Sequence, residues 1–479
     1  MADRSPTALC WIRRDLRLSD HAALAAATAA HPSVAVVFVF DRNILDALED
    51  RADRRVTFIH RSLAELDAKL RAVGSQLIVR HGDPQHEIPA LAAALGVKAV
   101  YTARDYEPYA VTRDLAVRRD LQAQGIAFET VVDSVVIEPG QVLSQSGTPF
   151  RVYSPFARAW RKALRAEHTA IHAPNLAHFA PTDAISARSV DWSMSALGFT
   201  PTELWLEPGE DAANARLDEF RPRIAQYAES RDFPAKPGTS GLSVHLRFGT
   251  ISIRELVRRA QEQGDSGDKW LAELIWRDFY QDLLWHHPQV VTECFQPQFN
   301  DLQWPGEESH WRAWCEGQTG FPIVDAAMRC LNATGWMHNR LRMIVASFLT
   351  KDLLIDYRRG EAYFAAKLLD FELASNNGGW QWAASTGADA QPYFRIFNPV
   401  LQSERFDPDG AFIRTWCPEL AGLSGKAVHW PAGASAMELE TASLTLGKQF
   451  PKPIVNHALQ KDRAIGLLAS VAKRKPSEA

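Results

Sequence analysis

The sequence contains few cysteines and no closely spaced pair of them. Five cysteines are scattered along the chain without a CxxC motif: Cys10, Cys294, Cys315, Cys330 and Cys417. This pattern argues against a zinc site, a disulfide framework and a four-cysteine iron–sulfur cluster. We expect buried, reduced thiols and no metal centre, because free cysteine is among the residue types most often buried.

Long apolar runs are also missing. The longest uninterrupted apolar stretch, around Val34 to Phe40, falls far short of the roughly 20 residues that cross a bilayer. No secretory signal is visible, because Asp3 and Arg4 lead quickly into the strand-like run Ala8 to Ile12. We therefore expect no membrane partner and a cytoplasmic protein.

Neither sign of charge dominates the chain. It carries 53 Lys and Arg against 57 Asp and Glu, a formal net charge of −4 at pH 7. A nucleic-acid-binding surface would therefore have to come from a local basic patch. The hydrophobic fraction of 46% is typical of folded domains, and 479 residues predict more than one of them.

The first third of the chain alternates β-rich runs with Ala-rich amphipathic stretches such as Val56 to Val73 and Glu87 to Leu95. This rhythm predicts an open parallel sheet with helices on both faces. No GxGxxG motif follows the first strand, which ends in the run Arg13 to Arg17, so an ordinary dinucleotide site is not supported there. The predicted strands are Ala8–Ile12, Val34–Phe40, Gln76–Arg80 and Lys98–Thr102.

The periodicity breaks up between Val131 and Ala212, where Pro and Gly recur, and strand signals nearly vanish afterwards. The predicted organisation is an α/β domain over residues 1–130, a linker over 131–212 and an all-α domain over 213–479. We interpret the one basic amphipathic piece of the linker, Phe156 to Arg165, as a solvated face. The predicted helices of the second domain include Asn214–Ser230, Ile253–Gln263, Lys269–His286, Pro322–Ala333 and Met337–Leu354.

Three polar constellations stand out in the second domain. The hexad Gly238 to Ser243 precedes a helical run, and its glycines and hydroxyls fit either a phosphate cradle or an ordinary helix N-cap, the commoner of the two. Asn339, Arg342 and Met343 share a face of a largely apolar helix. In the run Asp370 to Trp382, paired Asn and paired Gly allow the backbone to approach a ligand closely.

The helix over Lys269 to His286 carries a fourth constellation. Glu273, Trp276, Arg277 and Tyr280 follow the spacing i, i+3, i+4, i+7 and therefore share one face. An acid, an indole, a guanidinium and a phenol suit a cavity that stacks an aromatic ligand and hydrogen-bonds its edge. A structural ion pair is the alternative for this helix and for the helix with Arg342.

The polar constellations described above, together with the runs Trp11–Arg17 and Tyr393–Pro399, occur in an order along the chain that resembles the photolyase/cryptochrome family. Within that family they resemble the class I photolyases, and the resemblance extends over essentially the whole chain. The resemblance implies an N-terminal α/β domain and a C-terminal helical domain that holds FAD in a U shape. It implies a monomer that splits cyclobutane pyrimidine dimers in single- or double-stranded UV-damaged DNA, using an electron from light-excited reduced FAD. The runs that carry it are Trp11–Arg17, Glu273–Tyr280, Trp336–Phe348, Asp370–Trp382 and Tyr393–Pro399.

By the same resemblance, the hexad and Tyr227 would bind the FAD phosphates. Gly241 stands where many relatives carry Arg, so one charged contact would be missing. Arg342 and Asp370 would pair beside the isoalloxazine ring. The implied FAD-binding residues are Tyr227, Thr239, Ser240, Gly241, Leu242, Ser243, Arg277, Arg342, Asp370, Phe371, Glu372 and Asn376.

Asn376 would face flavin N5. A neutral amide there avoids the repulsion that a carboxylate would exert on anionic reduced flavin. Family members with Asp or Cys at this place tend to be light sensors, so Asn376 favours repair. Phe371 and Glu372 stand where many repair enzymes have Gly and Asp, and the longer acid can still reach the flavin edge.

The resemblance also implies the lesion. Enzymes that repair (6-4) photoproducts place two His where this chain has Asn339 and Met343, a pair typical of dimer-splitting enzymes. Glu273 would hydrogen-bond the flipped bases, whose poor stacking lowers the cost of flipping them out. The implied lesion contacts are Glu273, Trp276, Asn339, Met343, Trp382, Arg395 and Gln402.

In this family, three tryptophans carry electrons from the protein surface to the flavin, a series called the electron wire below. The resemblance places it at Trp380, Tyr357 and Trp304, with tyrosine where relatives have the second tryptophan. Oxidised tyrosine must release its phenolic proton, so the central hop is slow, or it is bypassed through Trp311, Trp314 or another indole. This change affects the photoreduction of oxidised FAD and leaves repair by reduced FAD untouched.

The antenna pigment and two rival functions complete the expectations. Glu107, Tyr109 and Arg113 lie in the antenna region, and a deazaflavin, a folate or no pigment all remain open. A signalling light receptor is disfavoured by Asn376 and by an end of the chain soon after Lys473–Lys475. An electron-transfer flavoprotein without a DNA role would leave the lesion contacts without a purpose.

Overall fold

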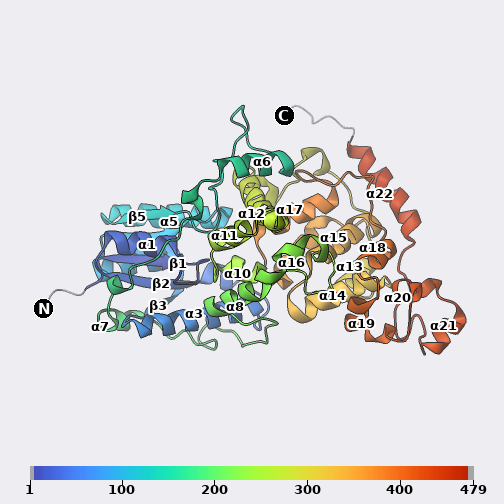
Figure 1. The fold of residues 1–479 in the computed structure, drawn as a ribbon, viewed down its shortest axis with the longest axis horizontal. Helices are drawn as coiled ribbons and strands as arrows, with labels where there is room; N and C mark the ends of the chain where they lie inside the picture. The colour runs from blue at the N-terminus through green and yellow to red at the C-terminus, as the bar shows by residue number, and fades with distance from the viewer. Residues whose placement is uncertain (1–4, 473–479) are drawn as a thin grey trace. The chain divides into compact units, whose positions relative to one another are not determined.

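The computed structural model describes residues 5–472, so Asp3, Arg4 and Lys473–Lys475 lie outside the described residues. The chain divides into two compact units, and Figure 1 shows its helices and strands coloured by residue number. Unit 1 comprises Met1–Phe150, Ser154–Ala225 and Ser240–His286, and unit 2 comprises Arg151–Tyr153, Gln226–Thr239 and His287–Ala479. The described part of the chain contains no helix long and apolar enough to cross a membrane.

Unit 1 contains a five-stranded parallel sheet in the order β3-β2-β1-β4-β5, which confirms the predicted open α/β sheet. β1 and β2 are buried along their whole length, as expected for strands covered on both faces. β5 was not predicted, because it is a half-exposed edge strand without a continuous apolar run. The strands are β1 (Ala8–Ile12), β2 (Val34–Asp41), β3 (Leu77–Gly82), β4 (Ala99–Ala103) and β5 (Ala127–Val131).

The helices around the sheet have clear start signals. Asp53 and Asp83 each accept a hydrogen bond from the backbone N–H two residues on, which caps α3 and α4, and α4 ends at Gly96 in the left-handed conformation. Leu9, Trp11 and Val37 lie in a core that also contains residues of α4 and α5. The helices are α1 (Ala22–Ala30), α2 (Arg42–Leu45), α3 (Arg54–Ala72), α4 (Pro84–Leu95), α5 (Pro108–Ala123), α6 (Tyr153–Ala163) and α7 (Thr182–Ile185).

Four more helices of unit 1 precede His287: α8 (Glu210–Phe220), α10 (Ser243–Phe248), α11 (Ile253–Glu262) and α12 (Asp268–His286). A single helix over Asn214–Ser230 was wrong. Pro222 interrupts it, since proline lacks the N–H that an α-helix needs, and a 3-10 segment, Arg221–Gln226, precedes the short α9 (Tyr227–Ser230). α11 and α12 agree with the prediction to within a residue.

A buried ion cluster attaches the loop after β1 to α11 within unit 1. Arg17 and Arg254 both bind the Asp133 carboxylate, at 2.7 and 2.8 Å, and Arg254 also contacts Asp20 at 3.1 Å. All four side chains are almost completely buried. Because each charge has an opposite partner and further hydrogen bonds, the cluster is tolerated in the core and fixes how α11 packs on the loop.

Unit 2 is built from helices packed around a core that includes Trp314, Phe321, Ile344 and Phe364. The predicted helix Met337–Leu354 is in fact two elements, α15 and a short π-helix, Phe348–Asp352. The helices are α9, α13 (Glu308–Glu316), α14 (Pro322–Thr334), α15 (Asn339–Ser347), α16 (Tyr357–Lys367), α17 (Leu373–Ala384), α18 (Pro399–Phe406), α19 (Ala411–Trp416), α20 (Lys426–His429), α21 (Ala436–Thr441) and α22 (His457–Ala472).

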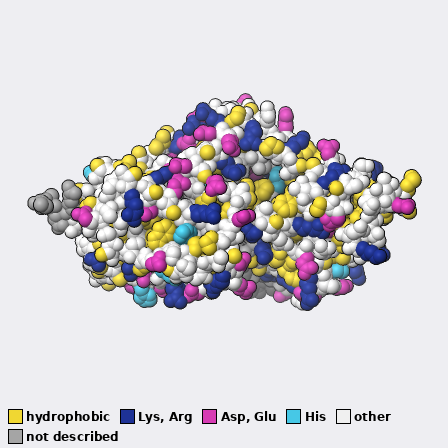
Figure 2. Space-filling view, turned by 90° about the horizontal axis from the view of Figure 1, so that it is seen from below, with side chains coloured by type: hydrophobic (Ala, Val, Ile, Leu, Met, Phe, Trp, Pro, Cys, Tyr) yellow, Lys and Arg dark blue, Asp and Glu magenta, His cyan; other side chains and the backbone are white. Residues whose placement is uncertain are grey.

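The surface charge is mixed. On the face that Figure 2 displays, basic and acidic side chains are interspersed, in keeping with the small net charge. Of the five cysteines, four are buried and Cys315 is half-buried, and all are free thiols, as predicted. Burial raises the pKa of Cys315 to about 12 and that of Cys330 to about 11, which keeps both protonated at neutral pH.

Candidate functional site

The polar face predicted on α12 exists in unit 1. Glu273, Trp276, Arg277 and Tyr280 are all half-exposed, and the residues between them along the helix are largely buried. The rings of Trp276 and Tyr280 lie 5.5 Å apart at a tilt of 34°, so they form one aromatic surface. Arg277 donates a hydrogen bond to the backbone carbonyl of Ser134, which fixes its guanidinium beside that surface.

Buried acids on the other side of α12 hold the segment around residues 136–140. Asp278 accepts hydrogen bonds from the Trp160 indole at 3.0 Å and from the backbone N–H of Val136 at 3.2 Å, and Asp282 accepts one from Gly140 at 2.8 Å. Burial raises the pKa of Asp278 to about 6, although these donors oppose the shift. These hydrogen bonds fix α12 against the segment around residues 136–140, with the half-exposed residues of its polar face on the other side.

The hexad Gly238 to Ser243 forms a tight turn that only small residues permit. A Cβ on Gly238 would lie 2.3 Å from the Ser230 carbonyl oxygen. Gly241 has φ +64°, and a Cβ on it would lie 2.7 Å from Nη1 of Arg216. Sequence analysis did not single out Arg216, whose proximity to the hexad depends on how α8 packs in unit 1.

In unit 2, Arg342 and Asp370 form the predicted pair. Nη2 of Arg342 donates to both carboxylate oxygens, at 2.8 and 3.0 Å, and its Nε donates to the Met337 carbonyl at 2.8 Å. The Asp370 side chain is only 2% exposed, whereas that of Arg342 is 27% exposed. The carboxylate therefore anchors a guanidinium whose remaining surface faces outward.

The amide of Asn376 on α17 has a defined orientation. Its Nδ2 donates to the Glu361 carbonyl at 3.1 Å, and a carbonyl can only accept, so the amide oxygen points the other way. The next residue, Asn377, donates to the Glu361 carboxylate at 3.0 Å. Burial raises the pKa of Glu361 to about 7, so this carboxyl is protonated in a substantial fraction of molecules at neutral pH.

These positions fit a flavin. The Asn376 oxygen would be able to accept a hydrogen bond from a flavin N5–H, and Arg342 would offer a cationic donor to the ring edge, as the resemblance predicts. A Cβ on Gly379, on the same helix, would meet no atom within 4 Å, so there is open space beside α17. Glu372 lies at the start of α17 and accepts a hydrogen bond from the Ser375 hydroxyl at 3.1 Å, and Phe371 packs partly against the core. Tyr227 is buried, with the Arg231 guanidinium over its ring.

The lesion contacts predicted in unit 2 are accessible. Asn339 and Arg395 are exposed, and Met343, Trp382 and Gln402 are half-buried. Nδ2 of Asn339 lies 3.9 Å from Sδ of Met343, so these two side chains form one surface on α15. Trp380 is buried in the core, whereas Trp382 packs against the same core but remains partly exposed.

The predicted wire residues do not have equivalent surroundings. Trp380 is buried, and Gly360 lets it approach α16, where a Cβ would lie 2.1 Å from the indole. The Tyr357 hydroxyl is buried, and its recorded hydrogen-bond partner is the thiol of Cys294, 3.7 Å away. Trp304 is half-buried and packs against the core.

A second row of indoles begins at Trp380. The Trp314 ring lies 6.1 Å from it, and the Trp311 ring stacks on Trp314 at 5.5 Å with an interplanar angle of 20°. Trp314 is fully buried and donates its indole N–H to the Val345 carbonyl at 3.1 Å, whereas Trp311 is partly exposed. Trp314 and Trp311, the residues suggested from the sequence as a route around Tyr357, therefore lie in ring-to-ring contact with each other and with Trp380 through Trp314.

The residues of the antenna region in unit 1 are engaged with one another. Glu107 binds Arg14 at 2.9 Å and Arg247 at 2.8 Å, and the Tyr109 hydroxyl donates to Asp41 at 2.7 Å. Arg113 lies 3.0 Å from Asp114 and 3.7 Å from Asp41. Whether a pigment binds here, and which one, stays a prediction.

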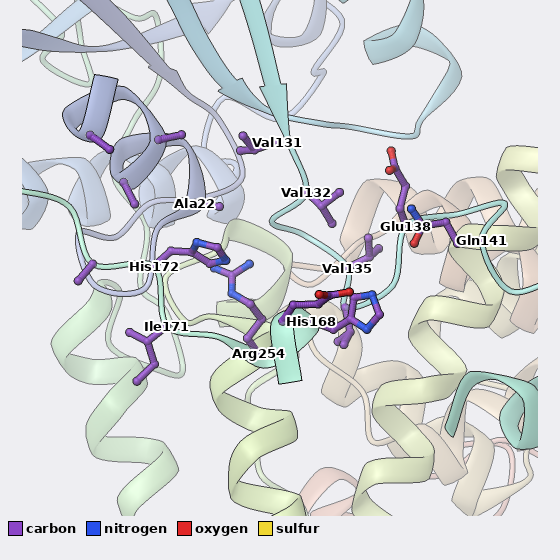
Figure 3. Close-up of a pocket in the computed structure, with 16 residues that line it drawn as sticks. Ala22, Val131, Val132, Val135, Glu138, Gln141, His168, Ile171, His172 and Arg254 are labelled. Atoms are coloured by element: carbon purple, nitrogen blue, oxygen red, sulfur yellow. The ribbon is translucent and has the colours of Figure 1, made fainter. Parts of the chain in front are cut away.

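A pocket of about 620 Å³ lies elsewhere in unit 1 (Figure 3). Alanines of α1 and the valines after β5 line it, together with His168, His172 and Arg254. Its size is typical of small-molecule sites. However, it contains none of the residues predicted for FAD or the lesion, and Arg254 is committed to the buried ion cluster. This pocket is therefore not the candidate site.

Comparisons with known proteins agree with this geometry. Family models described as "DNA photolyase" and "FAD binding domain of DNA photolyase" match residues 8–175 and 270–470. A deoxyribodipyrimidine photo-lyase of a Synechococcus species is 42% identical, covering 95% of this chain and 94% of its own. The chain belongs to the DNA photolyase family. The predicted family and the FAD cofactor are thereby confirmed.

Two solved structures confirm the fold. A class III photolyase from Agrobacterium tumefaciens has a TM-score of 0.90 and 36% identity, covering 98% of each chain. An archaeal photolyase from Sulfolobus tokodaii, described with two FAD molecules, has a TM-score of 0.81 and 33% identity, covering 97% of this chain and all of its own. The predicted combination of an α/β sheet with a helical FAD-binding part is correct.

Lys351 holds the C-terminal end of α17, the helix of Asn376 and Trp380. Its ammonium group donates to the Ala384 carbonyl at 3.1 Å and to the Ser385 hydroxyl at 2.8 Å. The side chain is completely buried, and burial lowers its pKa from 10.5 to about 7. It satisfies a carbonyl at a helix end, where a cation is electrostatically favourable.

We predict that Lys351→Met changes the pH dependence of stability. Between about pH 7 and 10 the unfolded chain holds this proton more tightly than the folded protein, so Lys351 makes the folded state more stable as the pH rises, by up to about 1.4 kcal/mol per pH unit. Urea unfolding at about pH 7 and 9 should show a smaller rise in the variant. Lys448→Met, at an exposed lysine of unit 2, is the control, and equal slopes in all three proteins would contradict the prediction.

Proposed function

We propose that the chain is a deoxyribodipyrimidine photolyase, a light-driven enzyme that splits cyclobutane pyrimidine dimers in UV-damaged DNA. The observation that carries this proposal is the neutral amide of Asn376, oriented by Glu361 and accompanied by the Arg342–Asp370 pair, in a chain of the photolyase family. The amide favours an electron-rich reduced flavin, because it adds no negative charge beside N5.

Each group of residues has a definite task in this reaction. Bound reduced FAD supplies the light-excited electron. Tyr227 and the segment Thr239 to Ser243 hold its phosphates, Arg277 borders the cofactor, and Arg342 and Asn376 fix the ring. Glu273 hydrogen-bonds the flipped dimer, and Trp276 and Trp382 stack on it. Asn339, Met343, Arg395 and Gln402 line the opening.

The finer expectations remain part of this proposal. They are a class I enzyme, a monomer, activity on both single- and double-stranded DNA, and a cytoplasmic location. The exposed Arg395 and the half-exposed Trp382 support DNA binding, because guanidinium groups contact phosphates and indoles stack on bases. A second, light-harvesting pigment is compatible with the Sulfolobus relative, whose description names a light-harvesting cofactor.

We predict that the reduced protein restores thymine absorbance when it is illuminated with single-stranded DNA that contains cyclobutane dimers. The measurement is the rise in ultraviolet absorbance of the DNA, compared between light and dark. DNA with (6-4) photoproducts is the substrate control and should show no recovery, because Asn339 and Met343 replace the two His of (6-4) enzymes. If light produces no recovery with dimer DNA, the proposed function is wrong.

Glu273→Ala is the matched variant for this experiment. Losing a hydrogen bond between a charged group and the lesion costs about 1.5–3 kcal/mol, so we expect roughly 10- to 150-fold weaker binding of dimer DNA. Glu262→Ala changes an acid of the same unit on α11, which binds Arg259 at the surface, and should leave the affinity unchanged. Unchanged binding by Glu273→Ala would contradict its assigned role.

We also propose that electrons reach the flavin through Trp380, Trp314 and Trp311. The contacts along this row support the proposal, because adjacent rings lie 5.5 and 6.1 Å apart. The Trp314 indole N–H donates a hydrogen bond to the Val345 carbonyl, which is too weak a base to take the proton, so Trp314 can be oxidised while it keeps its N–H proton. The Tyr357 hydroxyl, by contrast, lies beside the Cys294 thiol, which is a weak acceptor for the phenolic proton. Electron transfer from Trp304 through Tyr357 is therefore less favourable than transfer along the indole row.

A further inference from the structure

The uncharged segment Gly238 to Ser243 has an arginine of another element beside it, because the guanidinium of Arg216 occupies the space next to Gly241. A Cβ on Gly241 would lie 2.7 Å from Nη1 of Arg216 and 3.6 Å from its Cδ and Cζ. Gly241 also has φ +64°, a conformation that disfavours side chains. A side chain at position 241 would therefore collide with the Arg216 guanidinium where it now lies.

Arg216 is held in place by packing rather than by an acid. It lies on α8, and its guanidinium sits over the Trp205 ring, 5.2 Å from the centroid. The side chain is half-buried, and its guanidinium contact within residues 5–472 is the Trp205 ring. Among its charged neighbours, Glu219 stabilises the Arg216 cation and Arg223 destabilises it, so the two effects oppose each other. A half-buried guanidinium in this position is favourable beside an anion.

The hexad next to it offers the right chemistry for a diphosphate. Thr239, Ser240 and Gly241 are half-exposed, and Ser243 is exposed. The Ser240 hydroxyl accepts a hydrogen bond from the Leu242 backbone N–H at 3.3 Å, which stabilises the turn. Backbone N–H groups and hydroxyls in a turn bind phosphate oxygens, and an arginine adds charge-assisted donors.

We propose that Arg216 binds the diphosphate of FAD and supplies the charge that Gly241 lacks. This inference rests on the proposed function, because it takes FAD as the cofactor and the hexad as its phosphate site. It adds α8 to the cofactor-binding elements. It also explains why a glycine is compatible with FAD binding here: the cation comes from another helix of the same unit.

The test measures binding of flavins to the FAD-free protein. Arg216→Gln keeps part of the aliphatic stem and a polar end group, and it removes the charge. Loss of a charge-assisted contact predicts that its affinity for FAD falls at least about tenfold. Its affinity for riboflavin, which has no phosphate, should stay unchanged. Arg216→Lys keeps a cation and should recover part of the FAD affinity.

Arg118→Gln is the control, because Arg118 is a half-buried arginine of the same unit that lies over an aromatic ring, Phe128, at 5.6 Å. It should leave both affinities unchanged. Equal affinity of the parent and Arg216→Gln for FAD would overturn the inference, as would an equal fall for FAD and riboflavin, which indicates a packing effect. A parent protein that binds no FAD would overturn the proposed function instead.

Discussion

Asp370→Ala is expected to yield a protein that is purified almost without FAD. The carboxylate is the anchor of Arg342, with two hydrogen bonds of 2.8 and 3.0 Å, and it is nearly fully buried. Losing hydrogen bonds to a charged group costs about 1.5–3 kcal/mol, and the partly exposed Arg342 would keep only water as its partner. Arg342 would then turn toward water, and the flavin ring would lose its cationic neighbour.

The ratio of flavin absorbance to protein absorbance measures this effect, and we expect it to fall below about one tenth of the parent value. Glu419→Ala is the matched control, since Glu419 binds Arg329 at 2.7 Å in the same unit, away from the predicted flavin residues. Thermal unfolding of both variants shows whether they are folded. A folded Asp370→Ala protein with full FAD content would contradict the role of the pair.

The strands show how much of the fold can be predicted from sequence. The runs β1 to β4 are apolar and bounded by turn residues, so their positions were predicted to within two residues. β5 escaped because an edge strand is only partly buried and its residues need not be continuously apolar. The break after Phe220 was missed because the helical periodicity on both sides concealed Pro222.

The candidate site divides in the same way. The face of α12 and the pairing of Arg342 with Asp370 follow from helical spacing or from the family's motifs, and the structure contains both. The surroundings of Tyr357 and the proximity of Arg216 to Gly241 depend on packing between segments far apart in the sequence. Motifs identify which residues act, whereas tertiary packing determines which neighbours assist them.

Trp314→Phe is expected to slow the photoreduction of oxidised FAD at least about tenfold, the equivalent of roughly 1.4 kcal/mol added to the barrier. On the proposed route, Trp380 would give one electron to bound, light-excited FAD, Trp314 would reduce the oxidised Trp380, and Trp311 would reduce the oxidised Trp314. Thiol in solution would reduce Trp311 by one electron at a time and lose a proton to water, and two oxidised thiols would couple to one disulfide for every two electrons delivered. Phenylalanine is much harder to oxidise than an indole, so the variant interrupts this transfer at its second step.

The measurement is the rate at which flavin absorbance bleaches under blue light with excess thiol, at equal FAD content. Trp311→Phe changes the partly exposed end of the row and should also slow the rate, which keeps the test valid if Trp314→Phe folds poorly. Trp416→Phe removes a partly buried indole elsewhere in unit 2, whose recorded ring contact is with Phe412, and should leave the rate unchanged.

Tyr357→Phe distinguishes the two routes. If electrons pass through Trp314, removing the Tyr357 hydroxyl changes the rate by less than about twofold, since the neighbour of that phenol within residues 5–472 is a thiol, a weak proton acceptor. If Tyr357→Phe slows photoreduction strongly and Trp314→Phe does not, the tyrosine carries the electron and the indole row is wrong. The Arg359 guanidinium over the Trp311 ring would disfavour a positive charge on oxidised Trp311. Glu308 lies 2.8 Å from that guanidinium and offsets its charge, so electron transfer from Trp311 to Trp314 is not blocked.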